Sequence, residues 1–341
     1  MHTEAPWWRI LEIADSELLA GADWQKATRT LEFNRASRSG RPINAYQLGR
    51  GDRRVSITAG AHADEPIGPR TASLLPMLLS RHFPELLEQY TFYVVPDVNP
   101  DGAARNRAWS DTEAPHYNFR RYLRHRVREL PGDDIEFNYG DSDKARPENR
   151  TVMDFLEPNA PYNAHFSLHG MALAEGAWFL IGREWAARST PLQAELLAGC
   201  DALAFPLHDM ERHGEKGFHR IAPGFCTTPS ATAMREHFLA QGDPETAALF
   251  LPSSMEYIVG LGGDPLCMVS ELPLFTLRQS EAPLRHSNYH SCVAAIRASP
   301  HDASEVAVTD LMNAYDIRPV PIALQIRLQL IMLVATLDFL V

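Results

Sequence analysis

The stretch VSITAGAHADEPIG, residues 55–68, decides the fold class of this chain. Its first half is β-branched and apolar and stops at Gly60, which predicts a buried strand that ends in a turn. Residues 66–90 carry apolar side chains at helical spacing and predict a helix. The run TFYVV that follows is again strand-like and is closed by Pro96. Strand, helix and strand in this order favour an α/β protein whose sheet is largely parallel.

The rest of the chain repeats this alternation. Further apolar strands are predicted at 165–170 (HFSLHG), 177–182 (AWFLIG) and 266–275 (LCMVSELPLF), with helices at 191–204 and 230–240. We therefore predict a single α/β domain with a mixed, mostly parallel twisted sheet between helices. Residues 44–48 and 55–58 are extended runs joined by Gly49-Arg-Gly-Asp52, which predicts a hairpin between them.

Composition excludes several classes of protein. The chain has 341 residues, 45% hydrophobic and 22% charged, and a net charge of -11, which argues against nucleic acid or an anionic membrane as the main partner. The four cysteines stand far apart and suggest neither a cysteine-rich metal site nor a disulfide framework; they are Cys200, Cys226, Cys267 and Cys292. With no secretory signal pattern at the N-terminus, we expect a cytoplasmic protein.

Four polar residues stand at or just after the ends of predicted strands: His62, Glu65, His169 and Glu271. Ligands of open α/β sheets bind at the carboxyl ends of the strands, so these side chains are candidates for a site. His62 and Glu65 are three residues apart in a turn and can converge on one ion, with His169 supplying a third ligand. Two histidines and one glutamate leave a zinc position open for water, which is typical of a catalytic site.

The sequence around these residues resembles the zinc metallocarboxypeptidase family, whose members are also called funnelins. The resemblance rests on an ordered set of motifs, with Gly40-Arg-Pro-Ile43 and Arg146-Pro-Glu-Asn-Arg150 as further matches. The main motifs are Gly60-Ala-His-Ala-Asp-Glu-Pro-Ile-Gly68, Asn99-Pro-Asp-Gly102, Ser167-Leu-His-Gly170 and Val269-Ser-Glu-Leu272. It implies that His62, Glu65 and His169 bind one zinc ion and that Glu271 is the general base.

The family also places an arginine soon after the Asn-Pro-Asp-Gly turn, where it stabilises the oxyanion. Arg105 and Arg107 both fit this position, with Arg107 slightly preferred. The family's clamp for a peptide C-terminus is an Asn-Arg pair, and the matching pair here is Asn138 and Tyr139. A tyrosine offers neither charge nor a bidentate fork. Tyr257 is the nearest counterpart of the family's mobile tyrosine, and a packing role for it is at least as plausible.

An arginine-rich stretch, HYNFRRYLRHRVREL at 116–130, could compensate for the missing clamp. As one helix, it would place Arg120, Arg124 and Arg128 along a single face. The ordinary interpretation is a solvated helix face, and the alternative is a lid that attracts an anionic substrate.

We expect a zinc-dependent hydrolase that cleaves an amide bond next to a carboxylate-bearing residue of a small peptide. The alternatives are an amidase or deacylase for N-acyl amino acids or γ-linked cell-wall peptides, and a non-catalytic zinc-binding scaffold. Residues 38–300 are the expected catalytic domain, after an N-terminal helical extension at 1–37. The segment 301–341 contains an apolar helix, predicted to pack on the domain or on a second subunit rather than to anchor the chain in a membrane.

Overall fold

The computed structural model describes residues 5–20, 29–30, 35–129, 133–140, 143–277 and 304–341, together with positions 289, 293–294, 296 and 298. Cys292 and the expected domain boundary at 300/301 lie outside these residues. The strands are β1 (Arg29–Thr30), β2 (Tyr46–Gly49), β3 (Arg53–Ala59), β4 (Tyr90–Val95), β5 (Ala164–Ala174), β6 (Trp178–Ile181), β7 (Arg220–Ala222), β8 (Phe225–Thr227), β9 (Leu266–Thr276) and β10 (Arg318–Pro319).

The helices account for most of the remaining described residues. The α-helices are α1 (Asp15–Leu19), α2 (Ile67–His82), α3 (Pro84–Gln89), α4 (Pro100–Ser110), α5 (Phe119–His125), α6 (Pro147–Leu156), α7 (Thr190–Ala202), α8 (Ala231–Ala240), α9 (Pro244–Ala247), α10 (Ser254–Gly260), α12 (Glu305–Ala314) and α13 (Ile322–Phe339). Short 3-10 helices are η1 (Pro6–Glu12), η4 (Glu157–Asn159), η5 (Arg183–Arg188) and η6 (Glu215–Gly217).

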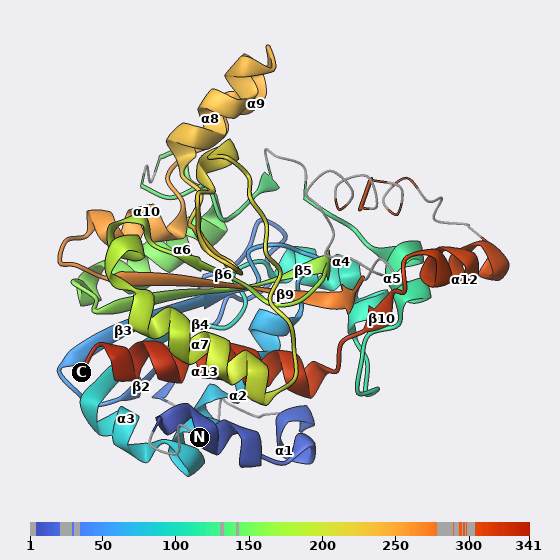
Figure 1. Ribbon diagram of the computed structural model, residues 1–341. Coiled ribbons are helices and arrows are strands. Elements are labelled where there is room, and N and C mark those ends of the chain that lie inside the picture. The colour runs from blue at the N-terminus through green and yellow to red at the C-terminus, as the bar shows by residue number, and fades with distance from the viewer. Residues whose placement is uncertain are drawn as a thin grey trace.

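The strands form one mixed sheet in the order β1-β2-β4-β3-β5-β9-β6-β8-β7, and β10 pairs with β9. The central strands β4, β3, β5 and β9 are parallel, and most paired positions of the sheet lie in parallel ladders. Helices cover both faces: α2, α7 and α13 lie on one side of the sheet, and α6 and α10 on the other (Figure 1). The predicted single α/β domain with a mixed, mostly parallel sheet is confirmed.

The predicted hairpin between residues 44–48 and 55–58 is wrong. Both segments are strands, but β4 lies between them: β2 pairs with β4 in antiparallel fashion, and β3 pairs with β4 in parallel. The Gly-Arg-Gly-Asp connection instead passes around the end of α3, where the Arg50 amide donates to the carbonyl of Leu87 (2.8 Å). All six residues of β4 are buried. Between β2 and β3, this strand is paired along both of its edges.

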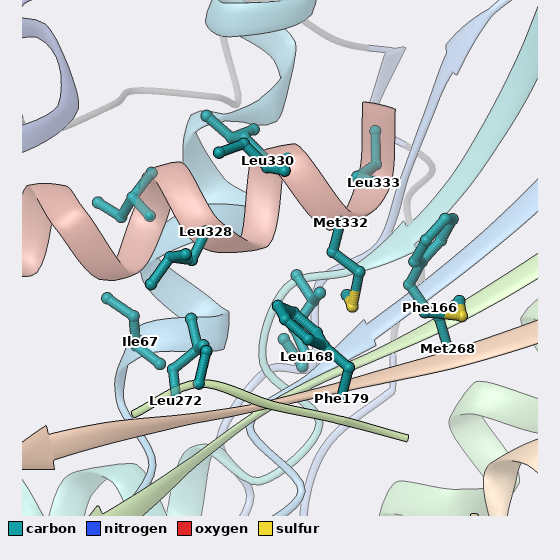
Figure 2. Packing of buried hydrophobic residues seen from close by; sticks show 14 of the residues in the cluster. Ile67, Phe166, Leu168, Phe179, Met268, Leu272, Leu328, Leu330, Met332 and Leu333 are labelled. Carbon is teal, nitrogen blue, oxygen red and sulfur yellow. The ribbon is translucent and has the colours of Figure 1, made fainter. Parts of the chain in front are cut away.

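The apolar C-terminal segment is a core helix of this fold. α13 is long and apolar enough to cross a membrane, but 78% of it is buried inside the structure. It packs on α2, α7, η1 and the sheet. Figure 2 shows its side chains against those of β5, β6, β9 and α2; the labelled residues are Ile67, Phe166, Leu168, Phe179, Met268, Leu272, Leu328, Leu330, Met332 and Leu333.

Two polar residues of α13 connect it to other parts of the fold. Arg327 reaches back to the N-terminal segment, where its Nη1 donates to Asp15 (2.6 Å). Gln329 is buried and donates to the backbone carbonyl of His169 (3.2 Å) and to the hydroxyl of Ser270 (2.9 Å). The described part of the predicted extension at 1–37 is not all helical, because β1 pairs with β2 at the sheet edge.

Two glycines allow the chain to turn from β3 into α2 beside β5. Gly60 has φ +76° and leaves no room for a side chain, because an added Cβ would lie 2.8 Å from the Asp97 carboxylate. At Gly68 an added Cβ would lie 2.1 Å from the carbonyl oxygen of Leu168. The start of α2 therefore touches β5 one residue before His169.

Candidate metal centre

Three side chains converge where β3 ends beside the middle of β5. The Nδ1 of His62 lies 2.8 Å from Glu65 Oε1, and the Nδ1 of His169 lies 2.9 Å from Glu65 Oε2. The two Nδ1 atoms are 3.2 Å apart. One ligand atom from each residue lies within 4.8 Å of the others. We call these residues, His62, Glu65 and His169, the ligand trio.

The local folding of each element brings the trio together. His62 and Glu65 lie in the turn after β3, and Pro66 and Ile67 then begin α2. His169 is on β5, where alternation separates it from the apolar Phe166 and Leu168 that face α13. The turn after β3 and the middle of the adjacent strand β5 therefore supply the two halves of the trio.

Glu271 lies directly beside His169. The two residues are partners in the parallel ladder of β5 and β9, and they occupy the same face of the sheet. Burial, reinforced by the nearby charge of Glu65, raises the pKa of Glu271 to about 8. A carboxyl group with this pKa can hold or release a proton near neutral pH.

The electrostatic interactions at the trio stabilise the protonated form of His169 and the ionised form of Glu65. Burial lowers the pKa of His169, but hydrogen bonds to Glu136 and Glu65 outweigh it and raise that pKa to about 10. Burial likewise opposes ionisation of Glu65, yet the two histidines hold its pKa well below the usual value. Two imidazole nitrogens and a carboxylate form the donor set that Zn²⁺ prefers, so the residues fit a zinc ion.

Acidic groups that the sequence analysis did not assign lie behind both histidines. Asp134 Oδ1 is 3.4 Å from His62 Nε2, and Glu136 Oε2 is 3.3 Å from His169 Nε2. Carboxylates commonly occupy this place behind histidines that bind metal. The sequence shows only that acidic residues recur at 133–136, and nothing in that pattern predicts which histidine each would reach.

Glu129 and Arg128 border the turn that carries His62 and Glu65. Glu129 accepts from the Ala63 amide (2.6 Å) and from Asn99 Nδ2 (2.8 Å). Arg128 lies 3.4 Å from the carboxylate of Asp64, the neighbour of Glu65. α5 ends at His125, so the predicted arginine face over 120, 124 and 128 is wrong: Arg128 is beyond the helix and beside the trio.

The two arginines proposed for the oxyanion lie on α4 but line different cavities. Arg105 lines a cavity of about 550 Å³ together with Asn99 and Glu129. Arg107 lines a second cavity of about 370 Å³ beside Asp97. Neither has a contact with the trio among the described residues, so the choice between them stays a prediction.

The proposed substrate-binding residues have partners away from the trio. Asn138 accepts a hydrogen bond from the Arg146 amide (2.8 Å). Tyr139 is 1% exposed and stacks on Tyr257 with 5.7 Å between ring centroids. Tyr257 itself donates to Glu157 (3.3 Å). In this structure the three side chains support packing between the 133–140 segment, α6 and α10.

Residues 27–175 match the family model for zinc carboxypeptidases, and this segment contains the whole ligand trio. This segment of the chain, somewhat less than half of it, is similar to zinc carboxypeptidases. A curated relative, zinc carboxypeptidase A 1 of Drosophila melanogaster, is 39% identical over 70 residues, which is 18% of this chain and 16% of that protein.

The likeness of fold extends beyond the matched segment. The structure of bovine thrombin-activatable fibrinolysis inhibitor, determined in complex with a tick carboxypeptidase inhibitor, covers 98% of this chain and is itself covered to 94%. The TM-score is 0.51 at 13% identity, so this likeness concerns the fold alone.

Proposed function

We propose that this chain is a zinc-dependent hydrolase that cleaves an amide bond next to a carboxylate-bearing residue. The observation that carries the proposal is the convergence of the ligand trio within 4.8 Å beside Glu271. Zinc held by His62, Glu65 and His169 would polarise the substrate carbonyl and lower the pKa of a water molecule.

Glu271 is the proposed general base. Its carboxylate accepts a proton from the attacking water and returns it to the leaving nitrogen. The pKa of about 8 belongs to the metal-free site, where burial and Glu65 disfavour the charged form. With a cation held by the trio, the pKa of Glu271 would fall into the range of a base at neutral pH.

The negative charge that develops on the carbonyl oxygen requires a cationic donor. Arg128 joins Arg105 and Arg107 as a candidate because it contacts Asp64, next to a ligand. Nearly half of its side chain, 47%, is exposed. An Arg→Ala series at these three positions, assayed for kcat, assigns the donor: the correct residue loses about 100-fold or more.

The test of the mechanism is zinc removal and the Glu271→Gln variant. A chelator should abolish amide hydrolysis, and added zinc should restore it. Glu271→Gln should remain folded and bind zinc while losing hydrolysis. Undiminished turnover after either change would refute the mechanism, and zinc binding without hydrolysis of any amide substrate would indicate a scaffold protein.

A small-molecule amidase is the second candidate. It is favoured by the segment 133–140, where Asn138 and Tyr139 are engaged in packing and offer no cationic clamp. Peptides with free C-termini, N-acyl amino acids and γ-linked peptides should be compared by kcat/KM. Preference for ordinary C-terminally free peptides would exclude this candidate.

A further inference from the structure

Glu136 is a buried carboxylate that the proposed chemistry does not use. Only 4% of the residue is exposed. Its Oε1 accepts from the Ser254 amide (3.1 Å) and from the Ser254 hydroxyl. Its Oε2 accepts from the Ser167 hydroxyl (3.2 Å) and lies 3.3 Å from His169 Nε2. Both oxygens therefore have partners, as a buried carboxylate requires.

These contacts determine which nitrogen of His169 carries a proton. Nε2 faces two acceptors, Ser167 Oγ at 2.9 Å and Glu136 Oε2 at 3.3 Å, so it is the nitrogen that donates. Nδ1 faces Glu65 and His62, and its lone pair would bind a metal ion in place of a proton. A carboxylate behind a histidine also increases the basicity of the ligand nitrogen and holds the ring in position.

Glu136 is itself held from two directions. Ser254 begins α10, and its hydroxyl lies 3.2 Å from the Nε2 of His165, whose Nδ1 is 2.8 Å from the Ser56 hydroxyl. The carboxylate thus joins α10 to β5 and, through His165, to β3. A connected network of buried polar groups is rigid when all its members are paired, and here it ends at a proposed ligand.

We propose that Glu136 is a positioning residue for the metal ion. It holds the His169 ring so that Nδ1 faces His62 and Glu65, and it places a negative charge next to Nε2 on the opposite side of the ring. This inference rests on the proposed zinc site. It differs from a purely structural role, in which Glu136 would only pair the buried amide and hydroxyl of Ser254.

Zinc affinity, measured by competition with a chromophoric chelator, separates the two roles. Glu136→Gln keeps the size and an acceptor oxygen but removes the charge, and it should weaken zinc binding by about 10- to 100-fold. Glu148→Gln is the matched control. Glu148 is 1% exposed and accepts from the Arg38 amide (2.8 Å), but it contacts no member of the trio. Its variant should keep the wild-type zinc affinity.

A replacement variant and a spectroscopic measurement complete the test. If Glu136→Gln does not fold, Ser167→Ala replaces it: loss of the hydroxyl between His169 and Glu136 should still weaken zinc binding several-fold. Cobalt(II) loaded into Glu136→Gln should show a shifted visible spectrum, because the His169 ligand changes.

The outcomes distinguish the two proposals. Zinc affinity that is unchanged in Glu136→Gln, or in Ser167→Ala where the first variant does not fold, would overturn the positioning role. If the wild-type chain binds no zinc, the proposed function itself fails. Wild-type binding with equal losses in Glu136→Gln and Glu148→Gln would also overturn the positioning role, because a general loss of stability would then explain both.

Discussion

Gln329 connects the core helix α13 by hydrogen bonds to the two strands that carry His169 and Glu271. The residue is 1% exposed, and its Nε2 donates to the His169 carbonyl (3.2 Å) and to the Ser270 hydroxyl (2.9 Å). Its Oε1 has no partner in the part of the chain that the structure describes. His169 and Ser270 lie on β5 and β9, so one amide spans both strands beneath the trio.

Replacing Gln329 by Met keeps the volume and removes both hydrogen bonds. Each bond contributes about 1 kcal/mol to the free energy of unfolding, and removing the unpaired, buried Oε1 increases that free energy by about 1 kcal/mol. We expect Gln329→Met to lower the free energy of unfolding by about 1 kcal/mol. Gln329→Ala leaves a cavity as well, and the total loss should reach about 3–4 kcal/mol.

Gln325, one helical turn earlier, is the matched control. The residue is 0% exposed. Among the described residues, its Nε2 donates only to the Val320 carbonyl (3.1 Å) and its Oε1 lacks a partner. One bond lost and one unpaired atom removed should nearly cancel. Gln325→Met should therefore stay within about 0.5 kcal/mol of the wild type.

Urea unfolding of the metal-free protein, with the same m-value for each variant, measures these differences. If Gln329→Met matched the wild type, or lost no more than Gln325→Met, the bonds to His169 and Ser270 would not hold the helix to the strands.

Three further predictions concern stability. Burial raises the pKa of Asp101, but hydrogen bonds from Ser37 and Arg41 outweigh it and lower that pKa to about 2, below the usual 3.8. This stabilisation is present above about pH 4 and lost as the pH falls to 2, so Asp101→Asn should cost about 1 kcal/mol at pH 7 and almost nothing at pH 2 in urea unfolding. Burial raises the pKa of Glu129 from 4.5 to about 7. The unfolded chain loses this proton first, so the metal-free protein should lose about 2–3 kcal/mol between pH 4.5 and 7; Glu129→Gln should remove that loss, and an unchanged pH profile would contradict the assignment. Gly68→Ala should cost about 3 kcal/mol in thermal unfolding, because the new Cβ would lie 2.1 Å from a β5 carbonyl; a fully stable variant would mean that α2 does not approach β5 this closely.

Much of the fold followed from local sequence patterns. Apolar periodicity and turn residues correctly predicted the positions of strands β3, β4, β5, β6 and β9 and helices α2, α7, α8 and α13. Each of these elements buries one or both faces, and burial requires apolar residues at the spacing of a strand or a helix. The hairpin failed because strand pairing is not local: the connection at 49–52 has hairpin chemistry, but β4 occupies the position between the two strands.

The sequence by itself identified the ligand trio and Glu271 as candidates. Polar side chains at the ends of predicted apolar strands are costly to bury unless they have a binding partner. Only the tertiary structure decided which groups stand behind them. Asp134 and Glu136 meet His62 and His169 across 72 and 33 residues of chain, respectively. Such contacts depend on how β3, β5 and the 133–140 segment pack, and no spacing along the chain encodes that packing. The same physical reason explains Tyr139, which packing places in the core against Tyr257.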